Sequence, residues 1–159
     1  MLKLNFNPFP VLQTKRLLLR QITDQDANEL FALRSNESIM KYLDRPLAKS
    51  LDDALELIKK INTSLSNNDG ITWAISLQKE KKLSGTIGFW KMEKENYRAE
   101  IGYMLHPALQ GIGIMDEAVK EIINYGFAKM KLHSIEANIN PAKLQCVLKQ
   151  SYKREENIF

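Results

Sequence analysis

The chain has 159 residues, of which 44% are hydrophobic and 26% charged, and its formal net charge is +4. This length is enough for one domain with a real core, and the composition excludes a disordered chain. No apolar run is long enough to span a bilayer, and the first residues contain no apolar signal core. Cys146 is the only cysteine, which excludes an internal disulfide. We therefore expect a cytoplasmic protein without a membrane partner.

The basic excess is small, and no basic stretch is interleaved with aromatic side chains. Such a balance is typical of solvated surface lysines, although it is also compatible with a phosphate-bearing cofactor. We therefore expect no nucleic-acid partner.

The first part of the chain predicts a strand and two helices. Residues 16–22 form a short apolar segment bounded by polar residues, as expected of a strand. Thr23 or Asp24 can cap a helix that follows. Ser50 can cap a second helix, whose apolar residues recur at helical spacing until the turn-forming residues 66–70.

Beyond this turn the apolar period becomes that of strands. Three candidate strands, joined by short polar turns, are residues 72–77, 83–92 and 100–105. Their short connections imply an antiparallel meander. A Gly-rich loop at 109–113 then leads into a helix from about Met115 to Met130 and a strand at 134–139. A strand, loop, helix and strand in succession make a parallel pair with a right-handed crossover. The prediction is one α+β domain over residues 1–159, with a mixed, mostly antiparallel sheet, one parallel strand pair and flanking helices.

The loop from Gln110 to Met115 has the properties of an anion site. It leaves a strand and opens a helix, whose first amides have no intrahelical partner and carry the positive end of the helix dipole. Gly111 and Gly113 allow a sharp turn and a close approach to a ligand. A plain Gly-rich turn is the alternative. A dinucleotide fingerprint does not fit, because Asp116 stands where its third glycine belongs, and the Gly-Lys-Ser/Thr ending of a P-loop is absent.

The order of several short motifs resembles the GNAT superfamily, and within it the branch of the Rim-type (RimJ/RimL) ribosomal-protein N-terminal acetyltransferases. Gln110-x-x-Gly113 resembles the family signature Gln/Arg-x-x-Gly-x-Gly/Ala. The supporting motifs are Thr14–Arg20, Gly85–Gly88, Ala99–Tyr103, Leu105–Pro107, Glu117–Ala118 and Asn140–Pro141. The resemblance implies a three-layer GNAT fold. It also implies direct attack of a primary amine, either a protein N-terminal α-amine or a small amine, on acetyl-CoA in a ternary complex.

The resemblance also implies where the cofactor binds. Main-chain amides after the Gln position would hold the pyrophosphate of coenzyme A, and the end of the preceding strand would face its pantetheine arm. The implied cofactor-binding residues are Met104, Leu105, His106, Gln110, Gly111, Ile112, Gly113, Ile114, Met115 and Asn140. Met115 departs from the Gly or Ala of the signature. Asp116 would repel a nearby phosphate, so we expect its side chain to point away. The acceptor groove is expected mostly around residues 40–51, and no metal is expected.

Glu100 is the candidate general base, because the attacking amine must lose a proton. An ion pair within the sheet is the alternative role for this carboxylate. The family often places a Ser donor after the Asn-Pro step, where this chain has Cys146, a weak donor. Tyr103 is the other candidate acid for the leaving thiolate, although packing is the commoner role of a strand Tyr. For His106 and His133 we expect structural roles.

The C-terminal region is shorter than the resemblance implies. The chain ends at Phe159, where a family member continues into a β-hairpin. One consequence is an alternative function, a degenerate acyl-CoA-binding or interaction module without turnover. The other is a bare sheet edge after a strand near Asn138, which favours a homodimer with residues 152–159 near its interface.

Overall fold

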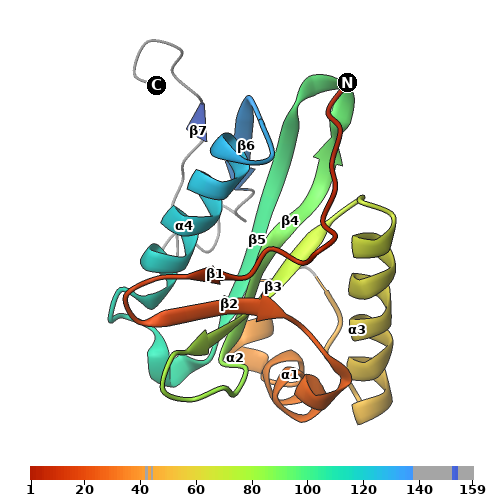
Figure 1. Cartoon of the computed structure of the whole chain (residues 1–159). Helices are drawn as coiled ribbons and strands as arrows, with labels where there is room; N and C mark the ends of the chain where they lie inside the picture. Colours follow the sequence, from red (N-terminus) through yellow and green to blue (C-terminus); the bar gives the residue numbers. More distant parts are fainter. Residues whose placement is uncertain (42, 44, 138–151, 154–159) are drawn as a thin grey trace.

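A seven-stranded sheet separates two layers of helices (Figure 1). The computed structural model describes residues 1–41, 43, 45–137, 152 and 153. The strands are β1 (Leu12–Gln13), β2 (Leu17–Gln21), β3 (Ile71–Leu77), β4 (Gly85–Glu93), β5 (Arg98–Leu105), β6 (Ser134–Ala137) and β7 (Tyr152–Lys153). The α-helices are α1 (Ala27–Arg34), α2 (Glu37–Met40), α3 (Leu51–Ser66) and α4 (Ile114–Ala128). Short 3-10 turns occupy Asp24–Asp26, Lys94–Asn96 and Pro107–Leu109. Within the described ranges, no helix has both the length and the apolar character needed to cross a membrane.

The strands follow one another across the sheet in chain order, and the predicted α+β class is confirmed. All neighbours are antiparallel except β5 and β6, which pair in parallel from Arg98↔Ser134 to Ile101↔Ala137. This parallel pair is the one that the strand, loop, helix and strand succession predicts. The crossover between β5 and β6 contains α4.

The prediction of a bare edge beyond β6 is wrong in the described part of the chain. Ser134 pairs with Lys153 and Ile135 pairs with Tyr152, so β7 returns antiparallel to β6. The backbone groups of a strand edge form hydrogen bonds with any extended segment that reaches them, and here the chain itself supplies one. The pairing therefore removes, at these residues, the argument for a partner chain.

Two apolar clusters fill the space on either side of the sheet. The larger lies under α4 and contains Trp73 and Phe89, whose rings meet edge to face at 6.3 Å. The smaller lies under α1 and α3 and contains Leu30, Ile58 and Met104. Strands β3 and β5 contribute residues to both clusters, which is the period-2 pattern of strands that are covered on both faces.

Most predicted elements are confirmed, with local differences. Ser50 caps α3 by accepting a hydrogen bond from the Asp53 amide. The helix predicted after Thr23 begins as a 3-10 turn and becomes α1 only at Ala27. The sequence did not predict β1, α2 or the packing of the N-terminal segment. Leu2 and Phe6 of that segment are buried, although the apolar residues of the segment show no periodicity that would indicate a buried face.

A partly buried ion pair fixes the start of α1. Arg20 of β2 donates two hydrogen bonds to the Asp26 carboxylate, at 2.9 Å and 2.8 Å, and the Thr23 amide donates a third at 2.9 Å. Desolvation raises the pKa of Asp26, but the bonds from Arg20 and Thr23 together outweigh it, and the net pKa lies below the ordinary value. The ionised carboxylate therefore stabilises the junction between sheet and helix.

We predict that Asp26→Asn lowers the free energy of unfolding by about 1.5–3 kcal/mol at pH 7, because charged hydrogen bonds are lost. Since the folded pKa is depressed, this contribution is present above the unfolded pKa, near 3.9, and is lost as pH falls through the folded pKa. Urea unfolding at several pH values measures the difference between the two proteins. Asp24→Asn, at an exposed position of the same turn, is the control and should change little. A difference that stays constant down to pH 3 would contradict this account.

Candidate active site

The loop between β5 and α4 has the geometry of an open anion site. Gly111 and Gly113 have φ values of 80° and 82°, in the left-handed region that favours glycine. Gly113 is the N-cap of α4, and no side chain caps the helix there. The residues from Gln110 to Gly113 are exposed, whereas Ile114 is buried. The first amides of α4 are therefore directed toward an exposed turn, as the sequence predicts.

A network around Glu117 attaches this loop to the start of the sheet. The Glu117 carboxylate accepts hydrogen bonds from the Thr14 hydroxyl, the Arg16 amide at 3.0 Å and Arg16 Nε at 2.9 Å. Arg16 Nη1 also donates to the Ile112 carbonyl at 3.0 Å, and a Cβ at Gly113 would lie 3.4 Å from Arg16 Nη2. Arg16 thus places a positive charge beside the loop. Sequence reasoning gave it no role, although Thr14–Arg20 and Glu117 both stood among the motifs.

The two carboxylates in the first turn of α4 both have cationic partners. Asp116 pairs with Lys120 along the helix at 2.9 Å, which agrees with the expectation that it points away from the loop. Desolvation raises the pKa of Glu117, but the hydrogen bonds from Thr14 and Arg16 outweigh it, and the net pKa lies below the ordinary value. The negative charges are therefore compensated locally, which reduces their repulsion of an anion at the loop.

The end of β5 is tied to the same loop. Gln110 Nε2 donates to the Leu105 carbonyl at 3.1 Å, which joins the first signature residue to the strand. His106 Nδ1 accepts from the Ala108 amide at 3.1 Å, so this side chain caps a 3-10 turn, the structural role expected of it. His133 stacks on Tyr97, with ring centroids 4.4 Å apart. Met104 and Leu105 are buried.

The candidate catalytic residues do not share one face of β5. Glu100 lies on the face toward α1 and α3, with Gly102 and Met104, whereas Tyr103 packs against the cluster under α4. Glu100 Oε2 lies 3.7 Å from Lys91 Nζ, so the alternative ion-pair role is present in this structure. Cys146 and Asn140 lie outside the described residues. The structure therefore does not place Glu100 and Tyr103 side by side.

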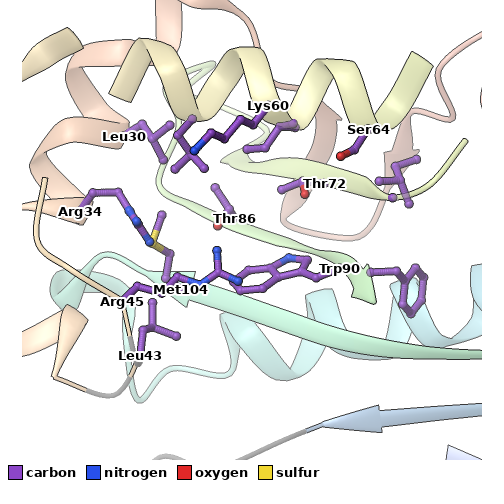
Figure 2. A pocket seen from close by; sticks show the side chains of 15 residues that line it. Leu30, Arg34, Leu43, Arg45, Lys60, Ser64, Thr72, Thr86, Trp90 and Met104 are labelled. Atoms are coloured by element: carbon purple, nitrogen blue, oxygen red, sulfur yellow. The ribbon is translucent and has the colours of Figure 1, made fainter. Parts of the chain in front are cut away.

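A cavity of about 240 Å³ opens between the sheet and helices α1 and α3 (Figure 2). Leu43 and Arg45 line it from the segment expected to carry the acceptor groove. Arg34 and Trp90 also line it, and sequence reasoning missed both. A half-buried Arg at the last turn of a helix gives no local signal that would have marked it as a site residue.

Trp90 is positioned by a β-bulge in β4. The register with β5 passes from Phe89↔Ile101 to Lys91↔Glu100, so Trp90 is the extra residue. A Cβ at Gly102 would lie 2.6–2.7 Å from carbons of the indole, which means that the ring covers this glycine directly. Bulges of this kind re-aim side chains next to active sites.

Comparison with known proteins decides the family. The family model described as Acetyltransferase (GNAT) domain matches residues 16–146. This chain belongs to the GNAT acetyltransferase family. The Bacillus subtilis protein YoaA, called an uncharacterized N-acetyltransferase, is 36% identical over 150 residues, which are 92% of this chain and 85% of YoaA.

Solved GNAT structures have the same fold. A GNAT-family acetyltransferase from Bacillus anthracis superposes with a TM-score of 0.74 and 26% identity, covering 86% of this chain and 78% of that one. RimL, a ribosomal L7/L12 alpha-N-protein acetyltransferase solved in complex with coenzyme A, has a TM-score of 0.77 at 18% identity, covering 86% of this chain and 78% of RimL. The identity to RimL is low, so that likeness concerns the GNAT fold alone.

We predict that Glu117→Gln lowers the free energy of unfolding by about 1–2 kcal/mol at pH 7, because charge-assisted bonds from Thr14 and Arg16 are weakened. Asp116→Asn, in the exposed surface pair of the same helix turn, is the matched control and should change stability by less than about 0.5 kcal/mol. Urea denaturation of both variants measures the difference. Equal effects would show that the Glu117 network is no stronger than a surface ion pair.

Proposed function

We propose that this GNAT protein transfers the acetyl group of acetyl-CoA to a primary amine. The observation that carries the proposal is the left-handed Gly111–Gly113 turn, which opens α4 without a side-chain cap and has Arg16 beside it. Membership in the family supports it, as does the coenzyme A complex of RimL, which has this fold.

In this proposal the amides of Gly111 to Met115 bind the pyrophosphate of the cofactor. The helix dipole and the guanidinium of Arg16 both favour a negative charge at that point. The main chain of Met104 to His106 faces the pantetheine arm. The parallel pairing of β5 with β6 ends at Ile101↔Ala137 among the described residues, so the last residues of β5 lie beyond it.

We predict that Gly113→Val reduces the affinity for acetyl-CoA at least about tenfold, since a β-branched residue at φ 82° distorts the turn and its side chain obstructs the phosphates. Calorimetric titration measures the affinity. Lys131→Val is the matched control, because Lys131 also has a left-handed φ, 64°, but lies in a turn after α4. Unchanged affinity in Gly113→Val would refute the loop assignment.

The proposed reaction is a direct attack of the amine on the thioester, and the chain must supply a proton acceptor for the amine and a proton donor for the thiolate. The amine nitrogen bonds to the thioester carbon, the carbon–sulfur bond breaks, and the amine proton passes to a base, directly or through one water. Glu100 is the proposed base, with its side chain 25% exposed and therefore reachable by water. The donors proposed from the sequence for the departing thiolate are Cys146 and Tyr103, of which Tyr103 lies on the face of β5 opposite to Glu100. An α-amine, with a pKa near 8, is deprotonated more readily than a lysine side chain near 10.4.

We predict that Glu100→Gln lowers kcat by about 10²–10⁴-fold while the affinity for acetyl-CoA is retained. The pH–rate profile should lose its acidic limb. Lys91→Gln is the control, because it removes the ion-pair partner at 3.7 Å and leaves the carboxylate in place. If both variants lose the same activity, Glu100 acts through the ion pair and the base lies elsewhere. Binding of acetyl-CoA without turnover of any amine would favour the alternative, an acyl-CoA-binding module.

A further inference from the structure

The cavity beneath α1 and α3 is lined by cations. Arg34 closes α1, Arg45 lies in the segment between α2 and α3, and Lys60 projects from α3 (Figure 2). Among the described residues, none that lines the cavity is an Asp or a Glu, and no ion pair joins these three cations to a carboxylate. The rest of the lining is mainly apolar, with Thr72, Thr86 and Ser64 as polar members.

Arg34 and Arg45 oppose one another electrostatically. Burial lowers the pKa of Arg34, and repulsion from Arg45 lowers it further. Arg34 is half-buried, so solvent only partly compensates its charge. A partly desolvated cation beside a second cation is electrostatically unfavourable, and an anion bound between them would offset part of that cost.

The protein holds Arg45 in this arrangement. Its guanidinium carbon lies 4.2 Å from the centroid of the Trp90 ring, a cation–π contact. Trp90 is the extra residue of the β4 bulge and rests on Gly102. Bulge, glycine, indole and guanidinium thus form a stack at the cavity, in which the side chain of Arg45 is still exposed to solvent.

The cavity lies on the same face of β5 as the proposed base. Met104 lines it, and Gly102 and Glu100 follow on that face along the strand. Cations nearby also disfavour a protonated amine, which lowers the amine pKa and increases the neutral form that attacks. The same field disfavours a polyamine, whose additional positive charges would enter among three cations.

We propose that this cavity is the acceptor site, and that its acceptor is a small amine carrying an anionic group, a carboxylate or a phosphate, bound by Arg34 and Arg45. The inference rests on the proposed acetyl transfer. The volume of about 240 Å³ is slightly below the usual ~300–1,000 Å³ of ligand pockets, which favours an acceptor of amino-acid size. The planar, forked guanidinium is suited to bidentate contact with either anion.

The test uses two pairs of small primary amines, in each of which one member carries an anionic group and the other a neutral group at the end opposite to the amine. O-phosphoethanolamine is compared with ethanolamine, and β-alanine with β-alaninamide, with acetyl-CoA saturating so that its phosphates occupy the cofactor loop. We expect kcat/KM to be at least about tenfold higher for one anionic member than for its neutral partner. The two pairs show whether the anion is a phosphate or a carboxylate. Shifts of the melting temperature with the same amines and coenzyme A give a second readout, independent of turnover.

Variants assign the preference to the cavity. Arg34→Gln and Arg45→Gln should each reduce the anionic preference, the ratio of kcat/KM for the anionic amine to that for its neutral partner, about tenfold or more. Arg34→Lys, which retains the charge, should keep part of the anionic preference that Arg34→Gln loses. Lys79→Gln, at an exposed position in the turn between β3 and β4, removes one charge elsewhere and should keep the preference.

The outcomes separate the two proposals. Equal use of charged and neutral amines, or a preference that survives in both Gln variants, overturns the anionic acceptor while acetyl transfer stands. Another outcome is that coenzyme A binds without any amine being acetylated. In that case, equal shifts of the melting temperature with the charged and the neutral amines also overturn the anionic acceptor. The absence of any melting shift with coenzyme A overturns the proposed function itself.

Discussion

Hydrogen bonds to the Glu117 carboxylate join the start of α4 to the start of the sheet, and the glycine turn before α4 depends on this connection. Glu117 lies in the first turn of α4, yet its hydrogen-bond donors come from Thr14 and Arg16, at the start of the sheet. Arg16 in turn donates to the Ile112 carbonyl within the glycine turn. A loop of left-handed glycines has high conformational entropy unless something restrains it. This network restrains it, while the residues of the turn stay exposed.

The alternation of β5 divides the site between two layers. Ala99, Ile101 and Leu105 anchor the strand to the α4 cluster, while Met104 belongs to the cluster under α1 and α3. The glycine turn follows from the end of this strand, and the cationic cavity lies over its other face. One strand thus connects the glycine turn, the proposed phosphate site, with the cavity that we propose as the acceptor site. A two-substrate reaction needs such an arrangement, because both ligands must be present at once.

The β-bulge at Trp90 positions an aromatic side chain in the cavity under α1 and α3. A regular pairing of β4 with β5 would place position 90 directly opposite Glu100; the extra residue instead brings Lys91 to that position and lays the indole over Gly102. Arg45 then stacks on the ring. The absence of a side chain at Gly102 is required for this layer, since a Cβ there would overlap the indole.

The sequence by itself determined the elements whose signals are local. Glycines at 111 and 113 before an apolar helical period predict an anion-binding helix start, Ser50 predicts the start of α3, and the spacing of strands and helix predicts the parallel pair. Tertiary structure alone decided the contacts between distant segments. Arg16 and Glu117 are 101 residues apart, and Arg34, Arg45 and Trp90 meet only when α1 packs on the sheet. Periodicity reports which face of an element is apolar, but not which partner that face meets or where a bulge re-aims a side chain. The glycine turn before α4 was therefore predictable from the residues, whereas the cationic cavity had to be seen in the fold.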